Sequence, residues 1–315
     1  MTGAPLEVRG LVKVYGDIVA VDHVDLTVKE GDVYGFLGPN GAGKTTSLRM
    51  MLGLIRPTEG AVRLFGRDPQ EGVAALEGVA GFVEEPRFYP YLSGRRNLEL
   101  LAGLDGGGAA ERIDESLETV ELADRAQDRV RGYSHGMRQR LGIAAALLRA
   151  PRLMLLDEPT TGLDPAGMRD MRELVRRLAD IGMTVLLSSH LLTEVEHLCD
   201  RVAIIRSGRL VYEGSMDELK ATQVGSHRLR TTDDERARRV CLAQPGIADV
   251  RAVAGGIAFA AGDDAVAALS VALVEAGAPP VEIARETATL EELFFRLTEG
   301  DQGDALPAAP VGDPA

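Results

Sequence analysis

The feature that most constrains this chain is the octet Gly38-Pro39-Asn40-Gly41-Ala42-Gly43-Lys44-Thr45. It matches the pattern G-x-x-x-x-G-K-[ST] in full, between the apolar residues 33–37 and the helical pattern 45–54. In such a strand–loop–helix unit the glycines turn backbone N–H groups inward, and the helix start adds partial positive charge. The octet therefore predicts an α/β domain with a phosphate-binding loop.

The same octet indicates that the ligand is a magnesium nucleotide. Lys44 is placed to reach the terminal phosphates, and the Thr45 hydroxyl is placed to ligate Mg²⁺. We expect the nucleotide to be bound by residues 38–45 together with Thr46.

A second candidate group is the carboxylate pair Asp157 and Glu158, which follows the apolar residues 153–156. Sheets of α/β proteins bind ligands at the carboxyl ends of their strands. Asp157 would then hold Mg²⁺ through water, and Glu158 would polarise the attacking water as general base. An apolar run followed by Asp-Glu is by itself only a strand end, so this interpretation depends on the octet upstream.

Hydrophobic patterning predicts a layered first domain. Short strands of an antiparallel β layer are expected at 12–14, 18–21 and 24–28. Continuous apolar runs, typical of parallel strands covered on both faces, lie at 33–37, 153–156 and 184–187. A helical subdomain at about residues 90–150 has expected helices at 97–104, 109–122 and 137–149. A hairpin is expected at 202–205 and 209–212.

The last third of the chain predicts a small α+β domain. Strands are expected at 227–231, 249–253, 256–260 and 280–284, with helices at 233–242 and 264–276. That order is ferredoxin-like, with an irregular regulatory region as the alternative. An amphipathic helix is expected at 287–297, before a tail rich in Pro, Ala, Gly and Asp. The expected domains are 1–222, 223–299 and a disordered 300–315.

Composition excludes several classes of protein. The net charge of −13 over 315 residues argues against a broad nucleic-acid-binding surface, so no nucleic-acid partner is expected. Cys199 and Cys241 lie far apart, without metal-ligand spacing, as in proteins of the cytoplasm. No run reaches the roughly 18 apolar residues of a spanning helix, so another chain would have to supply any membrane spans.

Further segments narrow the class of protein. Residues 133–140, Tyr-Ser-His-Gly-Met-Arg-Gln-Arg, resemble the signature motif of ABC ATPases, usually Leu-Ser-Gly-Gly-Gln. Residues 161–165, Thr-Gly-Leu-Asp-Pro, resemble the loop that follows the catalytic glutamate in that family. His190 falls at the family's switch histidine, and Tyr15 falls where an aromatic ring stacks on adenine. Each of these is weak alone, but together they follow the family's order from residue 15 to residue 190.

This resemblance implies an ABC cassette, with a mixed sheet core, an antiparallel β layer and a helical subdomain. Lys44, Glu158 and His190 would be its catalytic residues. In the family, a signature serine and glycine, here Ser134 and Gly136, close over the nucleotide bound by a second cassette. The resemblance therefore implies a homodimer, or a pair with a related ATPase chain.

Two departures from the family's motifs mark this chain. The signature has His135 for Gly and Met137-Arg138 for Gly-Gln. Glu84 stands where the family generally has a glutamine that ligates Mg²⁺. A carboxylate can ligate Mg²⁺ as well, and the alternative is that Glu84 and Glu85 form a solvated acidic turn.

The segment 84–98 resembles drug and bacteriocin exporter ATPases of the daunorubicin- and bacitracin-resistance type, and residues 289–294 resemble a C-terminal element of the same proteins. In that family the first segment contacts the membrane permease. The aromatic residues that would meet the permease, or pack inside the helical subdomain instead, are Phe88, Tyr89 and Tyr91.

The resemblance thus implies an ATP-binding and ATP-hydrolysing transporter subunit. It would power export of a drug, antibiotic, peptide or lipid-like substrate through a separate permease, from the cytoplasmic face of the membrane. The alternative is a soluble ABC ATPase without a permease. Such proteins carry two cassettes or a long coiled coil, and neither pattern is present in the sequence. A third alternative is another glycine-loop enzyme, such as a nucleotide kinase, in which the resemblance to the ABC signature motif would be accidental.

Overall fold

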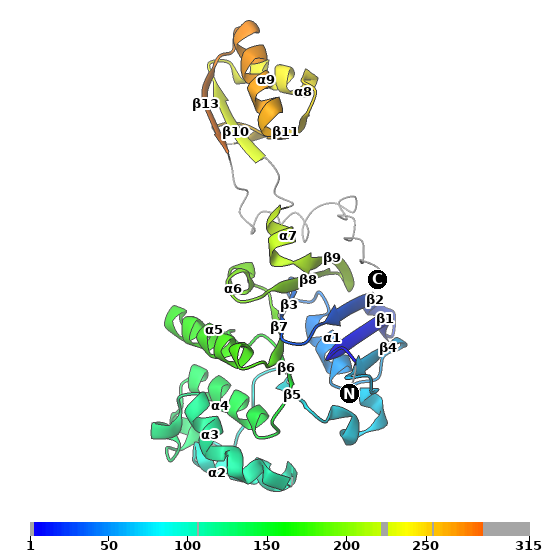
Figure 1. The fold of residues 1–315 in the computed structure, drawn as a ribbon, viewed down its shortest axis with the longest axis vertical. Helices are drawn as coiled ribbons and strands as arrows, with labels where there is room; N and C mark the ends of the chain where they lie inside the picture. The colour runs from blue at the N-terminus through cyan, green and yellow to red at the C-terminus, as the bar shows by residue number, and fades with distance from the viewer. Residues whose placement is uncertain (1–2, 106, 222–225, 254, 286–315) are drawn as a thin grey trace. The chain divides into compact units, whose positions relative to one another are not determined.

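The computed structural model describes residues 3–105, 107–221, 226–253 and 255–285. The chain forms two compact units that divide between Met216 and Asp217. The fold is drawn in Figure 1.

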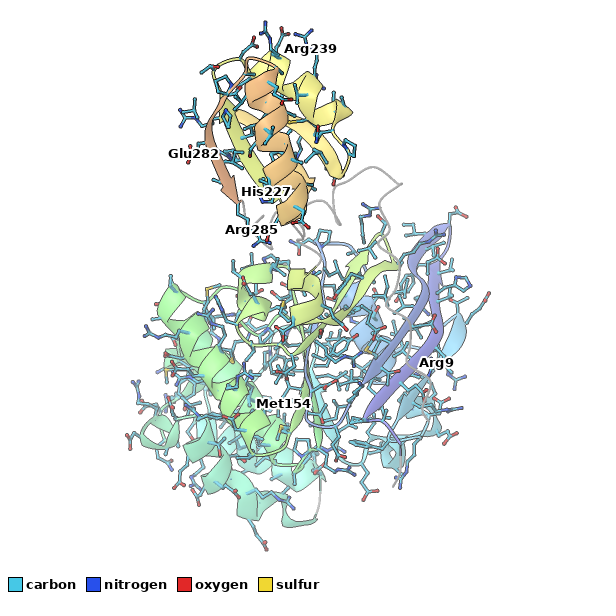
Figure 2. The ribbon with its side chains drawn as sticks, turned by 45° about the horizontal axis from the view of Figure 1, so that its top comes forward. Arg9, Met154, His227, Arg239, Glu282 and Arg285 are labelled. Carbon is cyan, nitrogen blue, oxygen red and sulfur yellow. The ribbon has the colours of Figure 1, made fainter. Side chains whose placement is uncertain are left out.

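The first unit is built around a six-stranded sheet in the order β5-β6-β7-β3-β8-β9. The strands are β5 (Val79–Phe82), β6 (Leu153–Leu156), β7 (Thr184–Ser189), β3 (Val33–Leu37), β8 (Arg201–Arg206) and β9 (Arg209–Ser215). The first five are parallel, and β9 completes the expected hairpin with β8. Met154, labelled in Figure 2, is fully buried in β6, as its continuous apolar run predicts. The carboxyl ends of β6, β7 and β3 therefore lie side by side.

A separate three-stranded antiparallel sheet has the order β2-β1-β4. Its strands are β1 (Leu6–Tyr15), β2 (Ile18–Val28) and β4 (Glu59–Leu64). The expectation of separate strands at 18–21 and 24–28 was wrong, because both belong to the 11-residue β2. That strand continues through the polar pair Asp22-His23, where His23 has a φ of 51° and the pairing shifts register.

Helices cover the six-stranded sheet on both faces. In Figure 1, α5 (Pro165–Asp180) lies on one side, and α1 (Lys44–Met51) lies on the other beside the three-stranded sheet. Leu48, Met50 and Met51 of α1 join the buried core shared with that sheet. The short helix α6 (Leu192–Glu196) follows β7.

The helical subdomain contains α2 (Gly94–Asp105), α3 (Ile113–Thr119) and α4 (His135–Leu147), which gather at one end of the unit in Figure 1. The expected helix 109–122 is shorter in the structure. Its first residues form part of the 3-10 turn Gly107–Arg112, and α3 stops at Thr119, shortly before Glu121 adopts a φ of 57°. Other 3-10 turns are Pro69–Glu71, Val73–Leu76, Ala123–Arg125 and Val130–Gly132.

The second unit has the predicted ferredoxin-like order. After α7 (Met216–Ala221) come β10 (Ser226–Thr231), α8 (Asp234–Ala243), β11 (Ile247–Val253), β12 (Gly256–Ala261), α9 (Asp263–Glu275) and β13 (Pro280–Arg285). The sheet order is β11-β12-β10-β13, with every pair antiparallel. His227, labelled in Figure 2, stacks on Phe259 with ring centroids 5.3 Å apart.

The predicted helix 287–297 and tail 300–315 lie outside the described residues. Across the ranges that are described, no helix combines the length and the apolar character needed to cross a bilayer.

Candidate active site

The octet forms the connection between β3 and α1, and two of its glycines are required by close packing. A Cβ atom on Gly38 would lie 2.3 Å from the carbonyl oxygen of Ile205. Gly43 has a φ of 107°, and a Cβ there would lie 2.5 Å from the carbonyl oxygen of Ala20. A side chain at either position would displace the loop from the sheet.

The start of α1 is open to an anion. Within the described residues, no side chain caps the helix, and its first turn contains no acidic residue. The first N–H groups of a helix have no partner inside the helix, so they are available to phosphate oxygens. This local arrangement fits a nucleotide phosphate.

Lys44 brings a buried positive charge to the same place. Its side chain is 5% exposed, and Nζ donates to the carbonyl oxygens of Gly38 at 2.7 Å and Pro39 at 3.3 Å. Nζ also lies 3.2 Å from Oε1 of Glu158, which follows β6. The lysine therefore joins the loop after β3 to the carboxyl end of β6.

The backbone at Glu158 is strained, and Ser188 at the end of β7 holds it in place. Glu158 has a φ of 46°, a left-handed conformation that costs about 1–3 kcal/mol for a residue with a side chain. Its N–H donates to Ser188 Oγ at 2.9 Å, and Ser188 Oγ donates to Asp157 Oδ1 at 2.6 Å. One hydroxyl thus fixes both carboxylate residues relative to the neighbouring strand.

The Glu158 carboxylate has three partners. Besides Lys44, Oε2 accepts a hydrogen bond from Thr161 Oγ1 at 2.8 Å and lies 3.0 Å from Nδ1 of His190. Because an ionised carboxylate only accepts, Nδ1 carries the proton in this contact. Burial raises the pKa of Glu158, but the Thr161 hydrogen bond and the nearby Lys44 and His190 outweigh burial and hold the pKa below its ordinary 4.5. The geometry keeps an ionised carboxylate beside the lysine.

The candidate magnesium ligands differ in their surroundings. Asp157 is 6% exposed, and Thr45 is half-buried at the start of α1. Glu84, with a φ of 69°, forms an ion pair with Arg49 of α1. Among the described residues, no group of three or more acidic, histidine or cysteine side chains is arranged to hold a metal ion. Mg²⁺ commonly takes one or two protein oxygens together with substrate phosphates, so the hard oxygens of Thr45 and Asp157 suit it.

Residues 134–136, in the segment that resembles the ABC signature motif, lie around the start of α4. Ser134 is the N-cap of α4, where its Oγ accepts a hydrogen bond from the N–H of Met137 at 3.2 Å. The neighbouring His135 lies 2.9 Å from the carbonyl oxygen of Thr161. Gly136 lies beside Leu163, since a Cβ there would be 3.5 Å from its side chain. His135 and Gly136 therefore lie against the loop after β6, while Ser134 caps α4.

Tyr15 ends β1 and leaves part of its ring exposed. The residue is 47% exposed, and Lys13 Nζ lies 5.0 Å from the ring centroid. An exposed aromatic face can stack on a planar base.

Sequence reasoning missed several hydroxyl groups that support this site. Ser188 and Thr161 hold the two carboxylates, as described above. Ser189 Oγ and Thr160 Oγ1 both donate to Oε2 of Glu194, at 2.8 and 2.6 Å. The Ser-Ser pair at the end of an apolar run was a usable signal, because it places hydroxyls at the carboxyl edge of the sheet. Glu194, 6% exposed, had no comparable signal in the sequence.

A separate apolar cleft lies on the helical subdomain. Its volume is about 370 Å³, and Phe82, Phe88 and Leu101 are among its lining residues. A second cleft beside it, of about 550 Å³, is also lined by Phe88 and Leu101. Tyr89 and Tyr91 are exposed by 55% and 63%, while Phe88 is half-buried. Two of the three aromatic residues therefore lie on the surface.

Comparison with known proteins agrees with this geometry. Residues 21–161 match the family model described as ABC transporter. The daunorubicin resistance ATP-binding protein DrrA3 of Streptomyces coeruleorubidus is 39% identical over 313 residues, covering 96% of this chain and 98% of that protein. The bacitracin transport ATP-binding protein BcrA of Bacillus licheniformis is 46% identical over 217 residues, covering 68% and 71%.

Solved structures are also similar. The ADP conformation of MJ1267, an ATP-binding cassette of an ABC transporter, has a TM-score of 0.63 at 25% identity and covers 69% of this chain and 93% of that one. The dimeric cassette MJ0796 bound to ADP and Pi has a TM-score of 0.61 at 26% identity, covering 67% and 98%. By its motifs, its fold and its near full-length similarity to a curated relative, this chain belongs to the ATP-binding proteins of the ABC transporter family.

Proposed function

We propose that this chain binds and hydrolyses MgATP to power export through a separate membrane permease. The observation that carries the proposal is the carboxylate of Glu158, which meets Lys44, His190 and Thr161 at the carboxyl edge of the sheet. Hydrolysis of ATP needs an oriented water and neutralised phosphate charge, and this group of side chains offers a base and a cation for those tasks.

In this mechanism Lys44 exchanges its loop carbonyl partners for phosphate oxygens, which are stronger acceptors because they are charged. Glu158 orients the attacking water and accepts its proton. His190 fixes one carboxylate oxygen of Glu158 through Nδ1. Thr45 and Asp157 would hold Mg²⁺, and we propose Glu84 as a further ligand. The ion would neutralise charge that develops on the phosphates.

The nucleotide would be bound mainly through the octet, with Thr46 beside it and Tyr15 stacking on adenine. Ser134 and Gly136 would complete the site of a second chain, because their α4 helix start forms another anion-binding position. The dimeric state of the related MJ0796 cassette supports this arrangement. We propose a homodimer or a pair with a related ATPase chain.

The clefts beside Phe88 and the exposed Tyr89 and Tyr91 suit an apolar segment of the permease. This partner would place the chain on the cytoplasmic face of the membrane. We further propose that residues 1–222 act as the cassette and residues 223–299 as an accessory domain.

The names of relatives suggest the class of cargo. Alongside the bacitracin and daunorubicin proteins, the Nod factor export ATP-binding protein I of Cupriavidus metallidurans is 41% identical over 236 residues, covering 74% of this chain and 78% of that protein. We propose export of a drug, antibiotic, peptide or lipid-like substrate.

The proposal is tested by co-expressing the chain with a multispanning membrane protein encoded beside it. We expect the two to co-purify, and we expect the ATPase rate to rise when the permease is reconstituted in lipid. A chain that hydrolyses ATP fully but neither binds nor responds to that permease would contradict the transport assignment and favour a soluble ABC ATPase.

A further inference from the structure

His135 stands at a position where the ABC signature motif usually has glycine. Its ring contacts two loops of the same chain. Nε2 lies 2.9 Å from the carbonyl oxygen of Thr161, in the loop after β6. Nδ1 lies 3.3 Å from Oε1 of Glu85, in the loop after β5. The side chain is 31% exposed, so most of the ring is enclosed by these contacts.

The contact with Thr161 reaches the candidate base in one further step. Because a carbonyl oxygen only accepts, His135 Nε2–H is the donor in this hydrogen bond. The hydroxyl of the same threonine donates to Oε2 of Glu158 at 2.8 Å. Thr161 is therefore held at its backbone by His135 while its side chain holds Glu158.

The local backbone favours this contact. Gly162 has a φ of 77°, and a Cβ there would lie 3.4 Å from His135 Nε2. Glycine adopts this left-handed turn without strain, and the turn lies within van der Waals distance of the imidazole ring.

On the opposite side of the ring, Nδ1 donates to Glu85 when both ring nitrogens carry protons, and Glu85 is also held by Arg138. Glu85 accepts a hydrogen bond from Arg138 Nε at 3.3 Å, and Arg138 Nη1 donates to the carbonyl oxygen of Tyr133 at 2.7 Å. Glu85 therefore has two partners from the start of α4. The loop after β5, the start of α4 and the loop after β6 are connected through one imidazole ring.

We propose that His135 is a positioning residue for ATP hydrolysis, acting on Glu158 through Thr161. This inference rests on the proposed role of Glu158 as general base. With glycine at position 135, the Thr161 carbonyl would have no side-chain donor from the signature. The histidine thus links the signature to the base of the same chain.

The test is steady-state ATPase kinetics of the full-length chain with His135→Leu, His135→Gln and Thr161→Val. We expect His135→Leu to lower kcat about fivefold with KM for ATP unchanged, because the lost hydrogen bond orients the base without binding nucleotide. Glutamine keeps an N–H donor, so His135→Gln should retain most of the wild-type kcat. His197→Leu, which changes an exposed histidine after α6, is the control and should match wild type.

A double variant tests the route through Thr161. In the Thr161→Val background, His135→Leu should lower kcat by less than about twofold, since the link to Glu158 is already cut. The proposal would be overturned if the losses of kcat in the two single variants multiply in the double variant, or if His135→Leu keeps a wild-type kcat. It would also be overturned if His135→Gln is as slow as His135→Leu, or if KM for ATP rises in parallel. If His135→Leu does not fold, His135→Gly replaces it in the same series.

Glu158→Gln is measured in parallel to separate the two hypotheses. Unimpaired hydrolysis in Glu158→Gln would show that Glu158 is not the general base. Loss of hydrolysis in Glu158→Gln with wild-type kinetics in His135→Leu would overturn only the positioning role.

Discussion

Lys44 Nζ and Glu158 Oε1 lie 3.2 Å apart, joining the glycine-rich loop after β3 to the strand end after β6. The pair crosses the sheet at the position of β7, whose Ser188 holds the backbone N–H of Glu158. Three neighbouring strands therefore contribute one charged or polar group each to a single network. The candidate cation for phosphate and the candidate base for water are parts of the same network.

The first prediction concerns Lys44. Lys44→Ala should weaken ATP binding about tenfold or more, because a buried cation at the helix start is lost. Isothermal titration with ATP measures the change, and Lys29→Ala, at an exposed lysine outside the loop, is the control. An unchanged ATP affinity in Lys44→Ala would count against the phosphate-binding role of the loop.

The second prediction concerns Ser188. Ser188→Ala should destabilise the fold by about 1–3 kcal/mol, because Asp157 and the N–H of Glu158 lose their shared partner. Chemical denaturation measures this, and kcat should fall in parallel as both carboxylates lose their anchor. Ser116→Ala, at a buried serine of α3, controls for the loss of a buried hydroxyl. Equal effects of the two substitutions would refute a special role for Ser188.

The third prediction follows from close packing at Gly38. Gly38→Ala should destabilise the first unit by about 2 kcal/mol or more, because its Cβ would lie 2.3 Å from a backbone oxygen of β8. Gly132→Ala is the matched control, since a Cβ there meets no described atom within 4 Å. Thermal midpoints of the two variants measure the difference, and similar midpoints would show that the loop can shift.

The fourth prediction is a pH dependence of stability. The pKa of Glu158 in the folded chain lies below its ordinary 4.5, so its ionised form is stabilised by folding. That contribution is complete above about pH 4.5 and is lost as the pH falls through the lower folded pKa. Denaturation midpoints of wild type and Glu158→Gln should therefore converge on acidification. A difference between the two midpoints that grows as the pH falls would contradict this prediction.

The strand–loop–helix unit around the octet and the buried strands were predictable because each depends on local sequence. The glycine pattern requires a strand before it and a helix after it, and both are present at β3 and α1. The β-α-β-β-α-β order of the second unit was predictable for a similar reason, since its alternating patterns are short and separate.

Other features depend on partners distant in the sequence. The ion pair between Glu84 and Arg49 joins residues 35 positions apart, and the bond from Ser188 to Asp157 spans 31. Neither is contained in a local pattern. The continuous strand β2 was missed because its polar middle, Asp22-His23, looks like a turn unless its pairing with β1 is known.

The central claim, that Glu158 is the base of an ATPase that works as a dimer, is tested most directly with Glu158→Gln. Size-exclusion chromatography with light scattering should show this variant as a stable dimer in MgATP and a monomer without it, while phosphate release falls by about a hundredfold or more. Normal phosphate release from Glu158→Gln, without ATP-dependent dimerisation, would contradict the account.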